Sequence, residues 1–560
     1  MGDGFSVSLG QGADGPVSLS KKARDTHLHL IGLSGQGKSY LIEHMMRQDI
    51  ENGAGVCLID PHGEVYRHMC DWLSAGEWHR TRRIHLINPA DGHWSIGFNP
   101  LSLDDPYIPA RVGAMIEGCQ KVWGDEESTG HKTLANLLEM VFTTLAFHKL
   151  SLMEAPLLTS LQHRETRQRL VEATGDAGLI DKWNELDFLK TNEFVTIFSA
   201  VTNRMRALTG SPGVAEMLGQ TEDVIDFKLC MDRGDVILVN LNDQGRVPPQ
   251  VAQTVGALIT ADLFRAAKQR DVDRAGEAPF YCYIDECGEY LNETVIHGLD
   301  QTRKYGLHYI LSHQRLAHLG DSPNHPIRNG VMNGAQSKIV FLQEDRETTG
   351  ELGELLFGKT FDLERPKEVL IKPTVVGYSR EWLEAEGEAF GKFEAETSGS
   401  MSGVATGTSA LDIENAIPVM FETESSGDSN SSNSGTSRIQ SRSWHEALVP
   451  ILEDLPGGVY SLEELKHEAA VAIRLLQKRQ AFAYRADDRL ALQFATADVH
   501  PARPTAEQNQ YFYDTVRRRE PSAKRPADVQ RDVSKRRAHL TGDVVDTLDP
   551  DACWEDVDSS

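Results

Sequence analysis

The stretch that decides the fold is Leu28-His29-Leu30-Ile31-Gly32-Leu33-Ser34-Gly35-Gln36-Gly37-Lys38-Ser39. It combines an apolar strand, a glycine-rich loop and a helix start, and the loop fits the pattern G-x-x-x-x-G-K-[ST]. In this pattern glycines let backbone N–H groups surround a polyphosphate, the lysine neutralises the β- and γ-phosphates, and the hydroxyl ligates Mg²⁺. The sequence therefore predicts a site for ATP and Mg²⁺ made by Gly32, Gly35, Gln36, Gly37, Lys38 and Ser39, with Ser39 as a metal ligand.

The residues after the loop support this prediction. Apolar side chains recur on one face of a helix, at Leu41, Ile42, Met45, Met46 and Ile50. The alternative is an ordinary glycine turn between a strand and a helix. A helix that follows the loop directly favours the nucleotide site, because its N-terminal end attracts phosphate.

Composition narrows the class of protein. The chain has 560 residues, 40% hydrophobic and 25% charged, which is ordinary for a globular protein of two or three domains. The net charge of −26 argues against a nucleic-acid-binding protein whose whole surface is basic. It does not exclude a local strip of basic residues inside a ring. The seven cysteines contain no C-x-x-C pair, so their spacing supports neither a disulfide framework nor a zinc site. We expect a cytoplasmic protein without a signal peptide or an integral membrane segment.

Apolar runs along the chain predict a sheet that a helical block interrupts. Strands are expected at 55–60, 84–87, 235–241, 280–286, 307–312 and 337–342. Residues 105–230 show helical periodicity and predict an all-helical insertion of about four or five helices. Ser, Gly and Thr dominate residues 396–442, which predicts a flexible linker. Strands alternating with helices place the chain in the α/β class.

Two carboxylates end the expected strand at 280–286. In a P-loop enzyme the first, Asp285, would hold Mg²⁺, and the second, Glu286, would orient and deprotonate the attacking water. An acidic strand-to-loop turn is the alternative. Asp60 and Glu64 also follow a strand and are rivals for these roles.

Further segments follow in a recognisable order. They are Asp60-Pro61-His62-Gly63-Glu64, Gly97-Phe98-Asn99-Pro100-Leu101, Asn203-Arg204-Met205-Arg206, Gln301-Thr302-Arg303-Lys304-Tyr305-Gly306 and Ser312-His313-Gln314. With the P-loop and Asp285-Glu286, this order resembles the HerA–FtsK superfamily of ring ATPases, in its conjugative coupling-protein (TraG/TraD-like) and HerA-like branch. The resemblance covers roughly residues 16–380.

The resemblance implies a RecA-like ATPase that assembles as a homo-hexamer and moves DNA through a central pore. Gln314 would be the glutamine that senses the γ-phosphate, although it could equally be a polar cap after a strand. Arg204 or Arg206 would reach the nucleotide of a neighbouring subunit, and spacing alone does not choose between them. Both arginines could instead belong to a solvated helix face.

The resulting prediction is a RecA-like P-loop core with an all-α insertion and a small C-terminal α+β domain. Its parts are a flexible lead-in (1–25), the core's first part (26–104), the helical insertion (105–230), the core's second part (231–395), the linker (396–442), the C-terminal domain (443–519) and a disordered tail (520–560). The function expected is that of an ATP-hydrolysing ring motor that translocates DNA. The alternatives are a secretion-type ring ATPase that moves proteins and an ATP-gated scaffold. The C-terminal domain or the tail is a candidate contact for a protein partner.

Overall fold

The computed structural model describes residues 4–542 except 104–106, 124–129, 243, 274–277, 293–295, 297, 363–364, 366–370, 394–398, 410–418, 430–434 and 457–458. The chain forms two units. One contains residues 1–360 and 466–560, and the other contains residues 361–465. Among the described residues, no helix has both the length and the apolarity needed to cross a bilayer.

The first unit is built on an eleven-stranded sheet, in the order β2-β1-β16-β15-β10-β3-β9-β8-β4-β7-β5. Its parallel strands are β3 (Leu28–Ile31), β4 (Gly55–Asp60), β5 (Ile84–Ile87), β7 (Val236–Asn240), β8 (Phe280–Ile284), β9 (Leu307–His313) and β10 (Ser337–Phe341). These strands are almost wholly buried, as expected for continuous apolar runs covered on both faces. The α/β prediction is confirmed. The carboxyl ends of β3, β4, β8 and β9 meet at one edge.

Four antiparallel strands extend the sheet beyond β10. They are β15 (Gln480–Tyr484), β16 (Ala491–Thr496), β1 (Val7–Gly12) and β2 (Gly15–Leu19). The structure therefore differs from the expected lead-in at 1–25 and from the separate C-terminal domain at 443–519. In β1 and β2 buried side chains alternate with more exposed ones, which is the pattern of strands with one face on a core. The buried ones are Val7, Leu9, Val17 and Leu19.

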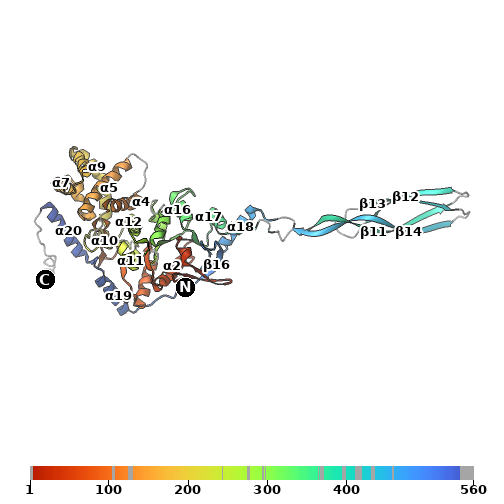
Figure 1. Cartoon of the computed structure of the whole chain (residues 1–560), viewed down its shortest axis with the longest axis horizontal. Helices are drawn as coiled ribbons and strands as arrows, with labels where there is room; N and C mark the ends of the chain where they lie inside the picture. The colour runs from red at the N-terminus through yellow and green to blue at the C-terminus, as the bar shows by residue number, and fades with distance from the viewer. Residues whose placement is uncertain are drawn as a thin grey trace, which may run out of the picture. The chain divides into compact units, whose positions relative to one another are not determined.

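Helices cover both faces of the sheet (Figure 1). On one face, α2 (Lys38–Glu51), α3 (Glu64–Ala75) and α19 (Ala506–Arg519) share a core with β1, β2, β3 and β4. On the other face, the long buried helix α12 (Pro249–Ala267) packs between the sheet and the helical insertion. Shorter elements complete the unit: α1 (Lys21–Arg24), α15 (Leu299–Thr302), α16 (Pro326–Gly334), α17 (Arg346–Phe357) and the two-stranded pair β6 (Ser95–Ile96) and β17 (Ala523–Lys524).

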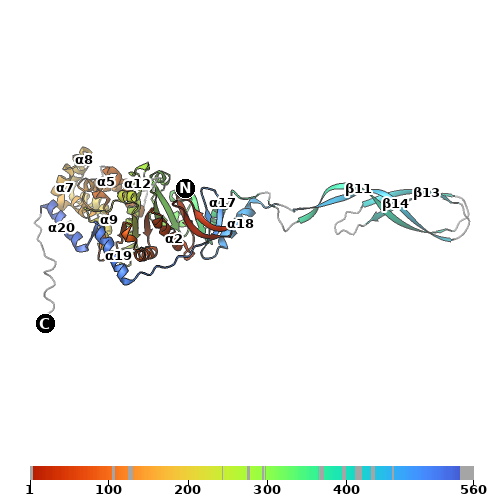
Figure 2. The same cartoon turned by 60° about the horizontal axis from the view of Figure 1, so that its bottom comes forward.

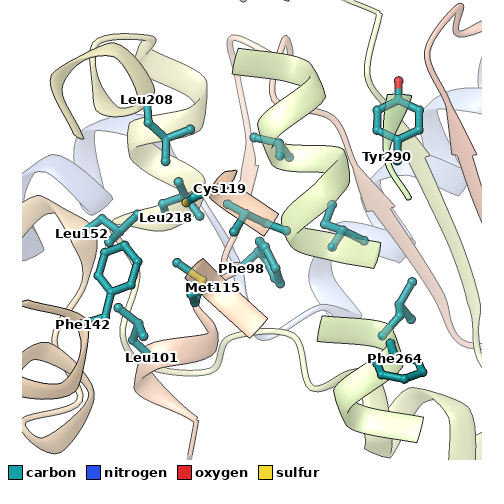
Figure 3. Close-up of a cluster of buried hydrophobic side chains, with 14 of the residues drawn as sticks. Phe98, Leu101, Met115, Cys119, Phe142, Leu152, Leu208, Leu218, Phe264 and Tyr290 are labelled. Atoms are coloured by element: carbon teal, nitrogen blue, oxygen red, sulfur yellow. The ribbon is translucent and has the colours of Figure 1, made fainter. Parts of the chain in front are cut away.

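The insertion is helical, as the periodicity of 105–230 predicts, with more helices than expected. It contains α4 (Ile108–Trp123), α5 (Gly130–Phe147), α6 (Ala155–Thr159), α7 (Arg164–Glu172), α8 (Ala177–Asp187), α9 (Thr191–Thr209), α10 (Pro212–Leu218) and α11 (Phe227–Arg233). Figure 3 shows Leu101, Met115, Phe142 and Leu152 gathered in its core. Gly118 lets α4 approach α12 closely, because a Cβ there would lie 3.0 Å from the Cα of Leu258. The insertion is therefore fastened to the sheet through α12.

The expected tail at 520–560 also differs in part. Residues 526–541 form α20 (Pro526–Thr541), which lies beside the helical insertion in both views (Figures 1 and 2). Val529 and Val533 on this helix are buried, and the Arg536 guanidinium pairs with Glu154 at 3.3 Å. These apolar and ionic contacts order a segment whose basic composition alone favoured disorder. Residues 543–560 lie outside the described residues.

The second unit consists mainly of two antiparallel strand pairs. In the first pair, β11 (Ile371–Phe393) runs beside β14 (Gly435–Pro456); in the second, β12 (Gly399–Ser409) runs beside β13 (Val419–Ser429). Much of the expected linker at 396–442 is therefore strand, while its residues 396–398, 410–418 and 430–434 are outside the described residues. The ladder is made by backbone hydrogen bonds, which a Ser/Gly-rich segment provides without an apolar face. Helix α18 (Leu462–Arg474) follows β14 along the chain.

Candidate functional site

The glycine-rich loop joins β3 to α2 with a backbone that requires glycine. Gly35 and Gly37 have φ values of 76° and 112°, in the left-handed region that L side chains rarely adopt. A Cβ on Gly32 would lie 2.5 Å from the Cβ of Phe341 on β10, so this position has no space for a side chain. The loop therefore presents bare backbone at the N-terminus of α2, as phosphate binding needs.

Lys38 and Ser39 are the first two residues of α2. The Lys38 ammonium donates hydrogen bonds to the carbonyl oxygens of Gly32 (2.6 Å) and Leu33 (3.3 Å), and the side chain is 7% exposed. Burial lowers the pKa of Lys38, although the nearby carboxylates of Asp285 and Glu286 act in the opposite direction. The ammonium is thus held beside the loop, with two carboxylates close enough to affect it.

The two predicted carboxylates follow directly after β8. Asp285 is buried, and its backbone N–H donates to the carbonyl oxygen of Ile59 on β4 at 3.1 Å. Burial raises the pKa of Asp285, and the neighbouring charges of Glu286 and Asp60 add to this shift. Glu286 has a φ of 46°, which turns the chain sharply after the strand. A bound divalent cation would offset the clustered negative charge.

Gln314 follows β9 and contacts Glu286. Its Nε2 donates to Glu286 Oε1 at 2.6 Å, and its backbone carbonyl accepts from Gln343 Nε2 at 3.0 Å. The other Glu286 oxygen lies 3.5 Å from Nδ1 of His318. The structure therefore brings Gln314 and Glu286 together, although they lie 28 residues apart in sequence.

These side chains surround one cavity of about 400 Å³. It is lined by Ser34, Gly35, Gly37, Lys38, Ser39, Tyr40, Asp60, His62, Glu64, Val65, Asp285, Glu286, Gln314 and Lys478. Two predicted binding residues, Gly32 and Gln36, are not among the described residues that line it. The volume suits a polar ligand of nucleotide size, because small-molecule sites span about 300–1,000 Å³.

The rival carboxylates have different surroundings. Both oxygens of Asp60 accept backbone hydrogen bonds at 2.9 Å, from His62 and Tyr66, so this carboxylate caps α3. Glu64 is exposed at the first position of α3. Asp60 is therefore already engaged in holding a turn, while Glu64 remains a free-standing alternative base at the cavity wall.

The two candidate arginines lie on α9, in the helical insertion. Neither Arg204 nor Arg206 is among the described residues that line the cavity. The Arg204 guanidinium donates to the Ala200 carbonyl at 3.5 Å and lies 6.0 Å from the centre of the Trp123 ring, and Arg206 is exposed. Within one chain the structure does not bring these arginines to the loop, and their role stays a prediction.

Two residues outside the predicted set, Lys478 and Arg479, also contact the site. Lys478, between α18 and β15, lines the cavity. The Arg479 N–H donates to the carbonyl oxygen of Gln36 at 2.9 Å. Its guanidinium is anchored on Thr496, Ala497 and Asp498. No local motif marks these residues, because they belong to the site only through contact with the glycine-rich loop, which lies far earlier in the chain.

Comparison with known families agrees with this geometry. Residues 7–202 match the model of the family described as helicase HerA, central domain. The resemblance to the HerA–FtsK ATPases is confirmed. No curated protein sequence matches the chain.

Solved structures of a coupling protein share the fold. The unbound conjugative coupling protein TrwBdeltaN70 has a TM-score of 0.51 at 14% identity, over 89% of this chain and 90% of that one. The plasmid coupling protein TrwB in complex with ADP and Mg²⁺, and the same protein with a non-hydrolysable ATP analogue, each have a TM-score of 0.50 at 14% identity, over 89% of this chain and 91% of theirs. At this identity the likeness establishes the RecA-like P-loop fold, and the activity is argued from the site.

Proposed function

We propose that this protein is a Mg²⁺-dependent ATPase that assembles into a ring and translocates DNA. The observation that carries the proposal is the convergence of Lys38, Asp285, Glu286 and Gln314 on one cavity, from the ends of β3, β8 and β9. This is the set of groups that phosphoryl transfer to water needs: a cation, a metal ligand, a base and an orienting amide.

Each residue has a distinct task in this proposal. Lys38 and the loop amides hold the polyphosphate, while Ser39 and Asp285 hold Mg²⁺, which neutralises phosphate charge when bound. Glu286 accepts the proton of the attacking water, and Gln314 keeps the Glu286 carboxylate in place through their 2.6 Å hydrogen bond. Lys478 adds a second cationic side chain to the cavity wall.

The ring is proposed because the candidate arginines on α9 are not among the described residues that line the cavity of their own chain. Arg204 or Arg206 would then serve the nucleotide of the neighbouring subunit in a homo-hexamer. An arginine supplied in trans stabilises the charge that develops on the transferred group. This assignment rests on the resemblance and on the distance of α9 from the cavity of its own chain.

DNA is proposed as the substrate from likeness. The matching family model is that of a helicase, and the similar solved structures are of a plasmid coupling protein. With a net charge of −26, the chain would need its basic residues gathered along a pore to hold phosphate.

The test is ATP turnover by the full chain with and without duplex DNA. We expect duplex to stimulate turnover in wild type and to have no effect on Lys38→Ala, which controls for contaminating ATPases. Stimulation by candidate protein substrates but not by DNA would instead indicate a secretion-type motor. ATP-dependent assembly with negligible turnover would indicate a scaffold.

A further inference from the structure

A second cluster of chemically active side chains lies away from the nucleotide cavity. It consists of His85 on β5, Cys230 on α11 and Asp235, which directly precedes β7. One ligand atom from each lies within 4.8 Å of the others, and the three residues are 2%, 1% and 3% exposed. These buried groups contact one another, and Asp235 also accepts hydrogen bonds from Nε (3.1 Å) and Nη2 (2.8 Å) of Arg233.

Two of the three distances between the ligand atoms are close to those expected around a tetrahedral metal ion. His85 Nε2 lies 3.5 Å from Cys230 Sγ and 3.0 Å from an Asp235 carboxylate oxygen. Zinc bond lengths place nitrogen and sulfur ligands about 3.5 Å apart, and nitrogen and oxygen ligands about 3.4 Å apart. A metal would therefore require the His85–Asp235 pair to open, with Cys230 Sγ already within 4.8 Å of the Asp235 oxygen.

The second nitrogen of His85 is held as a metal-binding imidazole requires. Its Nδ1 contacts a carboxylate oxygen of Glu520, which follows α19. The other Glu520 oxygen accepts hydrogen bonds from the Ser522 hydroxyl (2.7 Å) and the Ser522 N–H (3.2 Å). With a metal on Nε2, this carboxylate would accept the hydrogen bond of Nδ1–H, an arrangement found around most zinc-bound histidines.

The backbone preforms the cluster. Helix α11 ends at Gly234, whose φ of 70° makes a left-handed turn, and the Asp235 N–H then donates to the Cys230 carbonyl at 2.9 Å. Parallel pairing of β5 with β7 sets His85 opposite Ile237, two residues after Asp235. The three ligands thus come from β5, from α11 and from the short connection between α11 and β7.

We propose that His85, Cys230 and Asp235 bind a zinc ion, with water in the fourth position. A nitrogen, a sulfur and an oxygen ligand suit Zn²⁺ and not Mg²⁺, which prefers oxygen alone. The site would join β5, β7 and α11, and through Glu520 it would fasten the end of α19 to the sheet. None of the three ligands lines the nucleotide cavity.

The competing state is a protonated histidine held between two carboxylates. In that state the Arg233 guanidinium, 2.8 Å from Asp235, and the imidazolium balance Asp235 and Glu520. Zn²⁺ would displace one proton from His85 and one from Cys230, so the net charge of the cluster is the same in both states. Burial lowers the pKa of His85, but Cys230, Asp235 and Glu520 together raise it well above its ordinary value, so protons compete with the metal.

The test measures zinc bound to the full chain. The protein is dialysed against Zn²⁺ at pH 8 in excess Mg²⁺, so that Mg²⁺ occupies sites made of oxygen ligands. We expect about one Zn²⁺ per chain after removal of unbound metal. We also expect a thiolate-to-cobalt charge-transfer absorption when Co²⁺ replaces Zn²⁺. Cys230→Ala should lose both signals, and Cys119→Ala, which also removes a buried single cysteine, should retain them.

His85→Gln provides a second ligand variant if Cys230→Ala does not fold. It should lose the zinc equivalent while keeping the circular dichroism spectrum of wild type. Wild type that binds no more Zn²⁺ than Cys230→Ala, or a cobalt spectrum without the thiolate band, would overturn the proposal and leave an ion-paired histidine cluster. Equal loss in Cys119→Ala would show that the metal binds elsewhere.

Discussion

Replacing Glu286 with glutamine removes the proposed base and little else. Glu286 Oε1 accepts the 2.6 Å hydrogen bond from Gln314 Nε2, and the amide oxygen of a glutamine can take that place. The bond would lose its charge-assisted part, roughly 1 kcal/mol. Asp285 and Ser39 would still hold Mg²⁺, so nucleotide affinity should survive.

The effect on hydrolysis should be much larger. Loss of a general base lowers the rate by about 10²-fold or more. At 1.36 kcal/mol per factor of ten, this corresponds to about 2.7 kcal/mol in the activation free energy. The mutant should therefore accumulate in an ATP-loaded form while its melting temperature changes by only a few degrees.

The assay combines steady-state phosphate release, binding of a fluorescent ATP analogue and light scattering with and without ATP. Glu64→Gln is the matched control, because Glu64 lines the same cavity and is the rival base. A near wild-type rate for Glu286→Gln, with a strong loss in Glu64→Gln, would refute the assignment. A loss of nucleotide binding in Glu286→Gln would show that this carboxylate holds the metal.

Four further outcomes follow from the site. Lys38→Ala should abolish ATP binding without unfolding, and turnover within about twofold of wild type would rule out the P-loop assignment. Lys478→Ala should weaken nucleotide binding while leaving assembly intact, as measured by equilibrium titration. Arg204→Ala or Arg206→Ala should bind ATP but hydrolyse it slowly, and mixing with Lys38→Ala protein should restore part of the turnover; no recovery in confirmed mixed assemblies would exclude that arginine. Deletion of 399–429, which lies in the second unit, should leave ATPase near normal, and insoluble protein would show that these strands support the fold.

Local sequence signals identified side chains that the structure brings to one cavity. The P-loop joins one strand to one helix, and Asp285-Glu286 and Gln314 each end an apolar run. Because parallel strands share an orientation, residues at their carboxyl ends meet at one edge whatever their separation in sequence. The helical insertion was also predictable, since its periodicity is contained within each helix.

Long-range pairing explains what the sequence did not reveal. Strand β1 joins the sheet by pairing with β16, which lies far along the chain, and β2 joins it by pairing with β1. Lys478 and Arg479 reach the loop because β15 pairs with β10. The Ser/Gly-rich segment forms strands through its backbone, which composition does not report.

Displacement of a third strand from duplex DNA directly tests whether the protein moves along DNA. The full-length protein is mixed with duplex that carries a labelled triplex-forming strand, with ATP and Mg²⁺, and release of the strand is followed over time. If the protein translocates on DNA, we expect ATP-dependent release of the strand by wild type and none by Lys38→Ala or Glu286→Gln. Wild-type protein that hydrolyses ATP and binds the duplex, yet releases no more strand than Lys38→Ala, would contradict it.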